Sequence, residues 1–311
     1  MTLKDGSPAG VPGEILYSPI IDRPRITWPG DARVALWVAP NIEFYDFLPP
    51  HNPHRVACER VPEPQDVMAY SYRDYGNRVG IWRLAPVLDN YGVRATASLN
   101  IAVLDKYPEI CEAMVERDWE LMCHGIFNTR FFLGMDEDEE RAVLQDAIET
   151  MKRRTGKSMK GLFGPCCSAT ENTMRLAAEA GLIYSCEWYC DDQPFPINVP
   201  TGKLVGVPYG WDVNDDGFTF LDRVYDAELF LQMVKDQFDV LYEEGAESGR
   251  VMCIALHPFL TGQPHAIRYL DRMLDYILSH SGVWATTADK IAEHYLAEGY
   301  DDEMAYLREQ R

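Results

Sequence analysis

The sequence predicts an α/β fold, built as a single-domain distorted barrel with seven or eight parallel strands. Short apolar runs of strand length recur along the chain, and amphipathic segments of helix length separate them. Such alternation predicts a parallel sheet with helices outside it, and the number of repeats favours a closed barrel over an open sheet. The 311 residues fit one such barrel. No dinucleotide fingerprint, P-loop or nucleophile-elbow motif indicates another α/β architecture.

The predicted strands are continuous apolar runs, as expected of parallel strands that are buried on both faces. They cover residues 33–39, 94–100, 119–123, 160–164, 182–188, 203–207, 251–256 and 283–286. Helices are predicted between them at residues 77–91, 108–118, 136–154, 170–180, 226–244, 266–280 and 288–297. The helix at 136–154 is the clearest, because acidic residues open it and basic residues close it, as the helix dipole favours.

Three segments depart from this pattern. Residues 1–30 are rich in proline and glycine, which predicts an extended arm ahead of a barrel domain at 31–300. Residues 48–75 hold a run of prolines and tyrosines, which indicates an irregular insertion that acts as a lid or rim over the site or contacts another subunit. Residues 301–311 are acidic and are expected to form an exposed tail.

Composition narrows the classes of partner. The formal net charge of −20 argues against nucleic acid or an anionic membrane surface as a partner. No apolar run is long enough to span a bilayer or to serve as a signal peptide. The eight cysteines include no Cys-x-x-Cys pair and lie mostly in apolar segments, as reduced core residues do. We therefore expect a cytoplasmic homo-oligomer, a dimer or tetramer, that acts on a small molecule.

Polar and reactive side chains follow the predicted strands. They are Asn41, Glu43, Asn100, His124, Asn128, Glu187, Trp188, Asp191, Asp192, Tyr209 and His257. The carboxyl ends of parallel strands in a barrel meet at one mouth, so these groups are expected to converge there. A carboxylate with two histidines that titrate near neutrality supports hydrolysis at an acyl carbon. We predict that Glu43, His124 and His257 are the catalytic residues.

Other residues near the predicted mouth could bind substrate. The candidates are Asn41, Phe127, Arg130, Trp188, Asp191 and Tyr209. The aromatic residues would form pocket walls, Arg130 would hold a substrate carboxylate, and Tyr209 would stabilise a developing oxyanion. Simpler roles are open for several of them: core packing for Phe127 and Trp188, a surface ion pair for Arg130, and a turn cap for Asp191. For Glu43 the simpler role is a salt bridge to Arg73 or Arg130.

Six segments, taken in order, resemble the polysaccharide deacetylase superfamily, which has the NodB-homology fold. They are VALWVAPNIE (34–43), LMCHGIFN (121–128), GLFGPCCSATENT (161–173), WYCDDQP (188–194), VGVPY (205–209) and LHPFLTG (256–262). The resemblance spans about residues 30–295 and is nearest to the branch of deacetylase-type allantoinases and peptidoglycan-deacetylase-like proteins. It implies a distorted (β/α) barrel and hydrolysis of carbon–nitrogen bonds other than peptide bonds.

The resemblance also implies roles for individual residues. The first family motif supplies two aspartates, a general base and a metal ligand, and Asn41 and Glu43 stand in those places. The next motif supplies two histidines that bind the metal, and His124 and Asn128 stand there. His257 matches the late histidine, a general acid. The implied cofactor is a zinc-like divalent metal on Glu43, His124 and Asn128.

Two of these positions carry amides, which changes the expected chemistry. An amide cannot act as a general base and is a weak metal ligand, so a metal-free site with Glu43 as the base is the alternative. The departure favours a small amide, cyclic imide or ureide over a glycan as the substrate. A metal-dependent polysaccharide N-deacetylase and a catalytically silent ligand-binding barrel are the other hypotheses.

Overall fold

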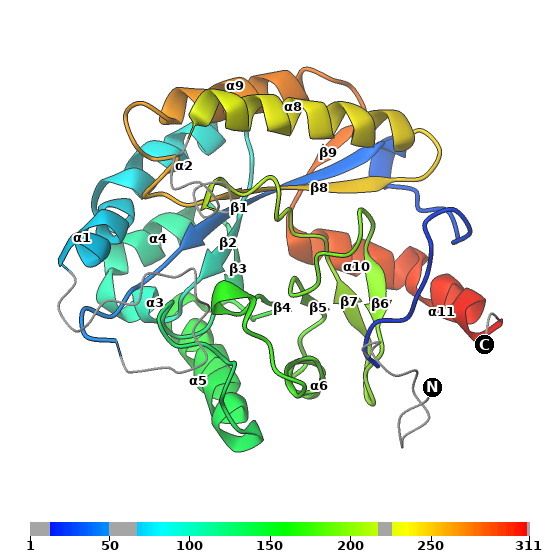
Figure 1. The fold of residues 1–311 in the computed structure, drawn as a ribbon, viewed down its shortest axis with the longest axis horizontal. Coiled ribbons are helices and arrows are strands. Elements are labelled where there is room, and N and C mark those ends of the chain that lie inside the picture. Colours follow the sequence, from blue (N-terminus) through cyan, green and yellow to red (C-terminus); the bar gives the residue numbers. More distant parts are fainter. Residues whose placement is uncertain (1–12, 50–66, 217–225, 310–311) are drawn as a thin grey trace.

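The sheet of this protein is curled, and all but one of its strand pairs are parallel (Figure 1). The structure is a computed structural model that describes residues 13–49, 67–216 and 226–309. The strand order is β6-β7-β5-β4-β3-β2-β1-β8, and β9 pairs with β1. The strands are β1 (Val34–Ile42), β2 (Thr96–Leu99), β3 (Glu120–Cys123), β4 (Gly161–Leu162), β5 (Tyr184–Ser185), β6 (Phe195–Ile197), β7 (Leu204–Gly206), β8 (Arg250–Leu256) and β9 (Val283–Ala285). The predicted α/β class and distorted barrel are confirmed.

Each predicted strand is present with shifted ends, but the sequence did not predict β6. Prolines at 194 and 196 count against a strand there, since proline lacks the N–H that a sheet ladder uses. The strand is tolerated because it lies at the end of the sheet and pairs only with β7, in antiparallel register. An isolated bridge from Ile15 to Ile197 ties the N-terminal arm to its other side.

Loops complete the barrel where strands do not. The strand β8 stands at the opposite end of the sheet from β6, and backbone bonds from two loops reach its outer edge. Val251 N donates to Asp192 O at 2.8 Å, and Ala255 N donates to Val213 O at 3.0 Å. The loops after β5 and β7 are therefore both fixed against β8, and the loop after β7 is held next to the point where His257 leaves that strand.

Helices cover the outside of the sheet. They are α1 (Val67–Tyr75), α2 (Ile81–Asn90), α3 (Ala102–Lys106), α4 (Pro108–Glu116), α5 (Glu137–Thr155), α6 (Thr173–Glu179), α8 (Ala227–Glu244), α9 (Ile267–Leu278), α10 (Ala288–Glu298) and α11 (Tyr300–Glu309). In Figure 1, α8 and α9 run side by side over β8 and β9. As predicted, α5 has acidic residues in its first turn and basic residues in its last, and a capping box between Asp136 and Glu139 starts it.

The segments outside the barrel differ from their predicted form. Part of the acidic tail is the helix α11, in which Asp301, Asp302 and Glu309 are exposed but Glu303 and Leu307 are buried, so the prediction of an exposed tail holds for only part of it. The acidic residues stand in the first turn of that helix, where its dipole favours them. Residues 67–75 of the predicted irregular insertion form α1, and residues 50–66 lie outside the described part of the chain.

The N-terminal arm packs on its own chain. Trp28 is buried and donates through Nε1 to the carbonyl of Arg250 at 2.9 Å, and Arg23 pairs with Asp191. In the described ranges, no helix is both long and apolar enough to cross a bilayer. The oligomeric state and the cytoplasmic location stay predictions.

Candidate active site

Strand pleating decides which side chains face the inside of the barrel. Two hydrophobic clusters lie on opposite faces of β1. Val34, Leu36 and Val38 belong to the cluster that also contains residues of the outer helices. Ala35, Trp37 and Ala39 belong to the second cluster, which we call the interior cluster. Because this alternation has a period of two, Asn41 and Glu43 follow the interior set. Met122 on β3 and Ala255 on β8 also belong to the interior cluster. The same alternation therefore directs His124 and His257 inward.

Strand register brings these residues to one level. Ile42 pairs with Leu99, Leu99 pairs with Cys123, and Pro40 pairs with Leu256. The next residues along the chain are Glu43, Asn100 and His124, and His257 follows Leu256. For these residues, the convergence at one mouth that the sequence predicted is present in the structure.

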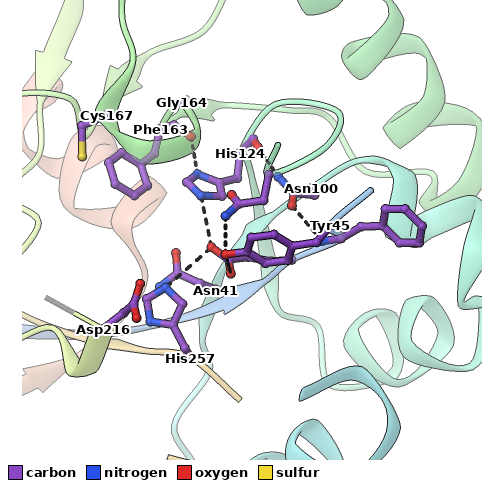
Figure 2. A network of polar contacts seen from close by, with 12 residues as sticks. Asn41, Tyr45, Asn100, His124, Phe163, Gly164, Cys167, Asp216 and His257 are labelled. Carbon is purple, nitrogen blue, oxygen red and sulfur yellow. Dashed lines mark hydrogen bonds and ion pairs between the residues drawn. The ribbon is translucent and has the colours of Figure 1, made fainter. Parts of the chain in front are cut away.

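One carboxylate oxygen is shared by two histidines. Glu43 Oε1 lies 3.6 Å from His124 Nε2 and 3.6 Å from His257 Nε2. Figure 2 shows the two imidazoles approaching from different strands, with Asn41 and Tyr45 beside them. The side chains of all three residues are no more than 6% exposed. The salt bridge from Glu43 to Arg73 or Arg130, considered as an alternative, is not among its ion pairs here.

A buried aspartate orients His257. Asp215 is fully buried and accepts from His257 Nδ1 at 2.7 Å, from the backbone N–H of His257 at 2.9 Å, and from the hydroxyl of Thr261 at 2.6 Å. Burial by itself disfavours the imidazolium, but the charge of Glu43 and the bond to Asp215 outweigh it and raise the pKa of His257 well above its ordinary value. His257 therefore carries a proton on Nε2 at neutral pH.

Sequence reasoning missed Asp215. The signal was present as four polar residues, Asp212, Asn214, Asp215 and Asp216, after the sixth predicted strand. The predicted site residues from this loop ended at Tyr209. In the structure the loop continues to the edge of β8, where an isolated bridge joins Asn214 to Ala255. An acidic loop that returns to a strand edge is a signal that could have identified this residue.

The other imidazole is fixed by a backbone carbonyl. His124 Nδ1 lies 2.6 Å from Phe163 O, and the two rings stack with centroids 4.9 Å apart. A carbonyl oxygen only accepts, so Nδ1 carries a hydrogen, and this bond turns Nε2 toward Glu43 Oε1. The N–H of the same peptide unit, on Gly164, donates to Glu187. The buried carboxyl group of Glu187 is thus linked to His124 through the peptide unit between Phe163 and Gly164.

Tyr45 holds the second oxygen of Glu43. Its hydroxyl donates to Glu43 Oε2 at 2.9 Å and accepts from Asn128 Nδ2 at 2.6 Å. Burial raises the pKa of Glu43, but the charge of His257 and the hydrogen bonds from the two histidines lower it further, to well below its ordinary range. The carboxylate is therefore ionised at neutral pH, beside a protonated His257.

Tyr209 and Asn41 form a second polar pair at the mouth. Asn41 Nδ2 donates to the Tyr209 hydroxyl at 2.9 Å, and both side chains are buried. Burial raises the pKa of Tyr209 well above its ordinary value, so the hydroxyl keeps its hydrogen. Since that oxygen accepts from Asn41, its own hydrogen can be donated to a ligand. Both residues were predicted to bind substrate.

The structure does not connect the remaining predicted residues to this network. Arg130 pairs with Asp46 at 3.1 Å and lies over the Phe127 ring at 4.1 Å. Trp188 packs against a small apolar cluster formed by Met174, Phe195, Ile197 and Leu204. Asp191 forms a two-bond ion pair with Arg23, at 2.8 and 2.7 Å. For these four residues the contacts agree with the simpler structural roles.

The residues present do not fit the implied metal. Among the described residues, no group of three His, Cys, Asp or Glu side chains is placed to hold a metal ion. Asn128 offers only a neutral amide oxygen, and it turns its amide nitrogen to Tyr45. The predicted set of Glu43, His124 and Asn128 is therefore two good ligands and one weak one, short of the three that catalytic zinc uses.

A carboxylate next to a protonated histidine, at the mouth of a (β/α) barrel, defines a hydrolase-type site in which one group removes a proton and the other supplies one. Comparison with known proteins agrees. A sequence model described as polysaccharide deacetylase matches residues 61–185. The crystal structure of Puue allantoinase is 31% identical with a TM-score of 0.80, covering 89% of this chain and 95% of that chain.

Two further relatives support the same family. A probable polysaccharide deacetylase from Pseudomonas aeruginosa PAO1 is 32% identical in sequence, with a TM-score of 0.78 and coverage of 89% of this chain and 95% of that chain. The peptidoglycan deacetylase of Helicobacter pylori is 23% identical over 253 residues, which are 71% of this chain and 85% of that protein. The chain belongs to the polysaccharide deacetylase family, and it is a hydrolase of carbon–nitrogen bonds other than peptide bonds.

Proposed function

We propose that this protein hydrolyses a carbon–nitrogen bond in a small amide, cyclic imide or ureide, with Glu43 as general base and His257 as general acid. One observation carries the proposal: an ionised carboxylate and a protonated imidazole face each other at 3.6 Å inside a buried site. An acid and a base kept in opposite protonation states at the same pH are what acyl hydrolysis requires.

The proton transfers follow from this arrangement. Glu43 takes a proton from water as the water oxygen bonds to the acyl carbon. His257 gives its Nε2 proton to the leaving nitrogen as the carbon–nitrogen bond breaks. The products are a carboxylic acid and an amine from an amide, an amide from an imide, or a urea from a ureide, and a cyclic substrate yields both groups in one ring-opened molecule. The proton on Glu43 can then return to His257 across the gap that separates them, which restores both groups for the next cycle.

His124 and Tyr209 have supporting roles in the proposal. The bond from His124 Nδ1 to Phe163 fixes the ring so that Nε2 faces Glu43, where it can orient the attacking water. Tyr209 keeps its hydroxyl hydrogen and can donate it to the oxygen that becomes negative during attack. Asn41 sets the direction of that hydroxyl by donating to its oxygen.

Two observations favour a small substrate over a polymer. The three proposed catalytic side chains are almost fully shielded from solvent, which suits a ligand that becomes enclosed. The amides at Asn41 and Asn128 also leave the site without the ligand set that a metal-dependent glycan deacetylase would use. The solved structure of an allantoinase, at 31% identity, supports the ureide within this class.

The test is a substrate screen with matched variants. The purified chain would be assayed against cyclic ureides, cyclic imides and N-acetylated sugars, beside Glu43→Gln, His257→Ala and the exposed control His265→Ala. We expect turnover of a small cyclic substrate by the unmodified chain and by the control only. Turnover of acetylated sugars alone would contradict the substrate class. Full activity in His257→Ala would contradict the assigned acid.

A further inference from the structure

Asn128 carries a buried oxygen that has no hydrogen-bond partner in the described part of the chain. The residue is 3% exposed, and its Oδ1 is one of few such atoms. Two of its other polar atoms are engaged: Nδ2 donates to the Tyr45 hydroxyl at 2.6 Å, and the backbone N–H donates to Phe44 O at 2.9 Å. The residue is therefore anchored once through its side chain and once through its backbone, and the acceptor of the side chain is left over.

The direction of this amide is determined by its neighbours. An ionised carboxylate only accepts, so the single hydrogen of the Tyr45 hydroxyl goes to Glu43 Oε2, 2.9 Å away. The Tyr45 oxygen must then accept from Asn128, which requires the NH₂ group of the amide to face Tyr45. Exchanging the amide oxygen and nitrogen would place two acceptors against each other. Asn128 therefore presents an oxygen, and not an N–H, at its free end.

Leaving such an oxygen unpaired has a cost. A buried acceptor without a partner loses about 1–3 kcal/mol, and native proteins contain few of them. The cost is removed if a ligand supplies a donor. Asn128 is two hydrogen bonds away from the Glu43 carboxylate, so the donor would belong to a molecule bound beside the reacting bond.

We propose that Asn128 Oδ1 accepts a hydrogen bond from a substrate N–H, and that it selects substrates that carry this donor. The inference rests on the proposed function. His257 faces Oε1 of Glu43, and Asn128 is linked through Tyr45 to Oε2. The substrate N–H that donates to Asn128 Oδ1 is therefore a different group from the leaving nitrogen, which takes its proton from His257. Tyr209 supplies the complementary donor for the carbonyl oxygen.

The experiment compares two substrates in each variant. One is a five-membered cyclic ureide, and the other is the same ring with oxygen in place of the N–H that is not cleaved. The replacement removes the donor and keeps the shape. The ratio of the two kcat/KM values, taken relative to the unmodified chain, cancels differences in intrinsic reactivity. Asn128→Ala removes the acceptor, and the exposed Asn198→Ala is the control.

We expect the preference for the N–H ring to fall about tenfold or more in Asn128→Ala, the value of one lost hydrogen bond, and to stay unchanged in Asn198→Ala. Tyr45→Phe is the second variant. It keeps the amide and frees it to rotate, so the preference should fall there too. An equal loss of kcat/KM for both rings in Asn128→Ala, in a variant with an unchanged melting temperature, would overturn the inference.

Three other outcomes are distinguishable. Calorimetric titration with Zn²⁺ tests whether the free oxygen is a metal ligand. Stoichiometric zinc binding that Asn128→Ala abolishes would overturn the inference in favour of a metal site. If the unmodified chain hydrolyses neither ring, the proposed function fails and the inference fails with it. If it hydrolyses both rings with no preference, only the inference fails.

Discussion

The substitution Asp215→Asn tests whether this buried carboxylate keeps His257 in its acid form. The change preserves shape but removes a negative charge and one acceptor oxygen. Asp215 accepts from His257 Nδ1 at 2.7 Å, from the His257 backbone N–H at 2.9 Å and from Thr261 at 2.6 Å. An asparagine has one acceptor oxygen for these donors, so at least one of them loses its partner.

The size of the effect follows from these contacts. A hydrogen bond to a charged group contributes about 1.5–3 kcal/mol, which corresponds to roughly 10- to 150-fold in rate if the bond to His257 Nδ1 is the one lost. The pKa of His257 should also fall, because the negative charge of Asp215 and its bond to Nδ1 both raise that pKa. The acid form of His257 is lost as the pH rises through this pKa, so a lower pKa moves the alkaline loss of kcat to lower pH.

The assay is kcat as a function of pH for the unmodified chain, for Asp215→Asn and for the exposed control Asp212→Asn. We expect kcat to fall about 10- to 150-fold near neutral pH in Asp215→Asn, with its alkaline limb displaced to lower pH. Circular dichroism and thermal melting establish that each variant is folded. A folded Asp215→Asn with an unchanged kcat and an unchanged alkaline limb would refute the role of Asp215.

Four further predictions concern the base, the metal, a buried acid and the N-terminal arm. Glu43→Gln should lower kcat about 10²- to 10⁴-fold with little change in melting temperature, because an amide cannot accept a proton from water; a smaller loss would point to another base. Dialysis against a chelator should leave activity unchanged, and a loss that zinc restores would show that a metal takes part. Burial raises the pKa of Glu187 to about 8, from an ordinary value of 4.5. Glu187 therefore binds its proton more tightly in the folded state, and the free energy of unfolding should fall as the pH rises from about 4.5 through 8, by at most about 5 kcal/mol. In urea unfolding at several pH values, the free energy of unfolding of Glu187→Gln should depend less on pH. An equal pH dependence in the variant and the unmodified chain would contradict this. Arg23→Ala should lower the free energy of unfolding by about 3–5 kcal/mol in the same assay, because it leaves the Asp191 carboxylate without its ion-pair partner. It should leave kcat unchanged, and a lower kcat would indicate that Asp191 contributes to the active site.

Fold class and the central residues could be predicted because the signals for them are local. Apolar runs and helical periodicity can be read within a short window, and they placed eight strands of the sheet. Side chains along a strand alternate between its two faces, so this pattern also decides whether the residue just after a buried strand points into or out of the barrel. That is why Glu43, His124 and His257 could be expected at one mouth before any coordinates were known.

The remaining features depend on contacts between distant parts of the chain. Asp215 reaches His257 across 42 residues, and Arg23 reaches Asp191 across 168. Neither pairing leaves a periodic trace in the sequence, because each depends on how the loops after β5 and β7 close the barrel against β8. The antiparallel strand β6 was missed for a similar reason: its prolines are acceptable only at the end of a sheet, and the end is a property of the assembled sheet.

By itself, the sequence determined the alternating α/β architecture, the residues at the strand ends and the presence of amides at Asn41 and Asn128. Only the tertiary structure decided the protonation states and the hydrogen-bond directions. Burial and neighbouring charge set the pKa values of Glu43 and His257, and both arise when distant segments come together. The direction of the Asn128 amide likewise depends on Tyr45 and Glu43, because a hydrogen bond requires a donor and an acceptor to meet in space.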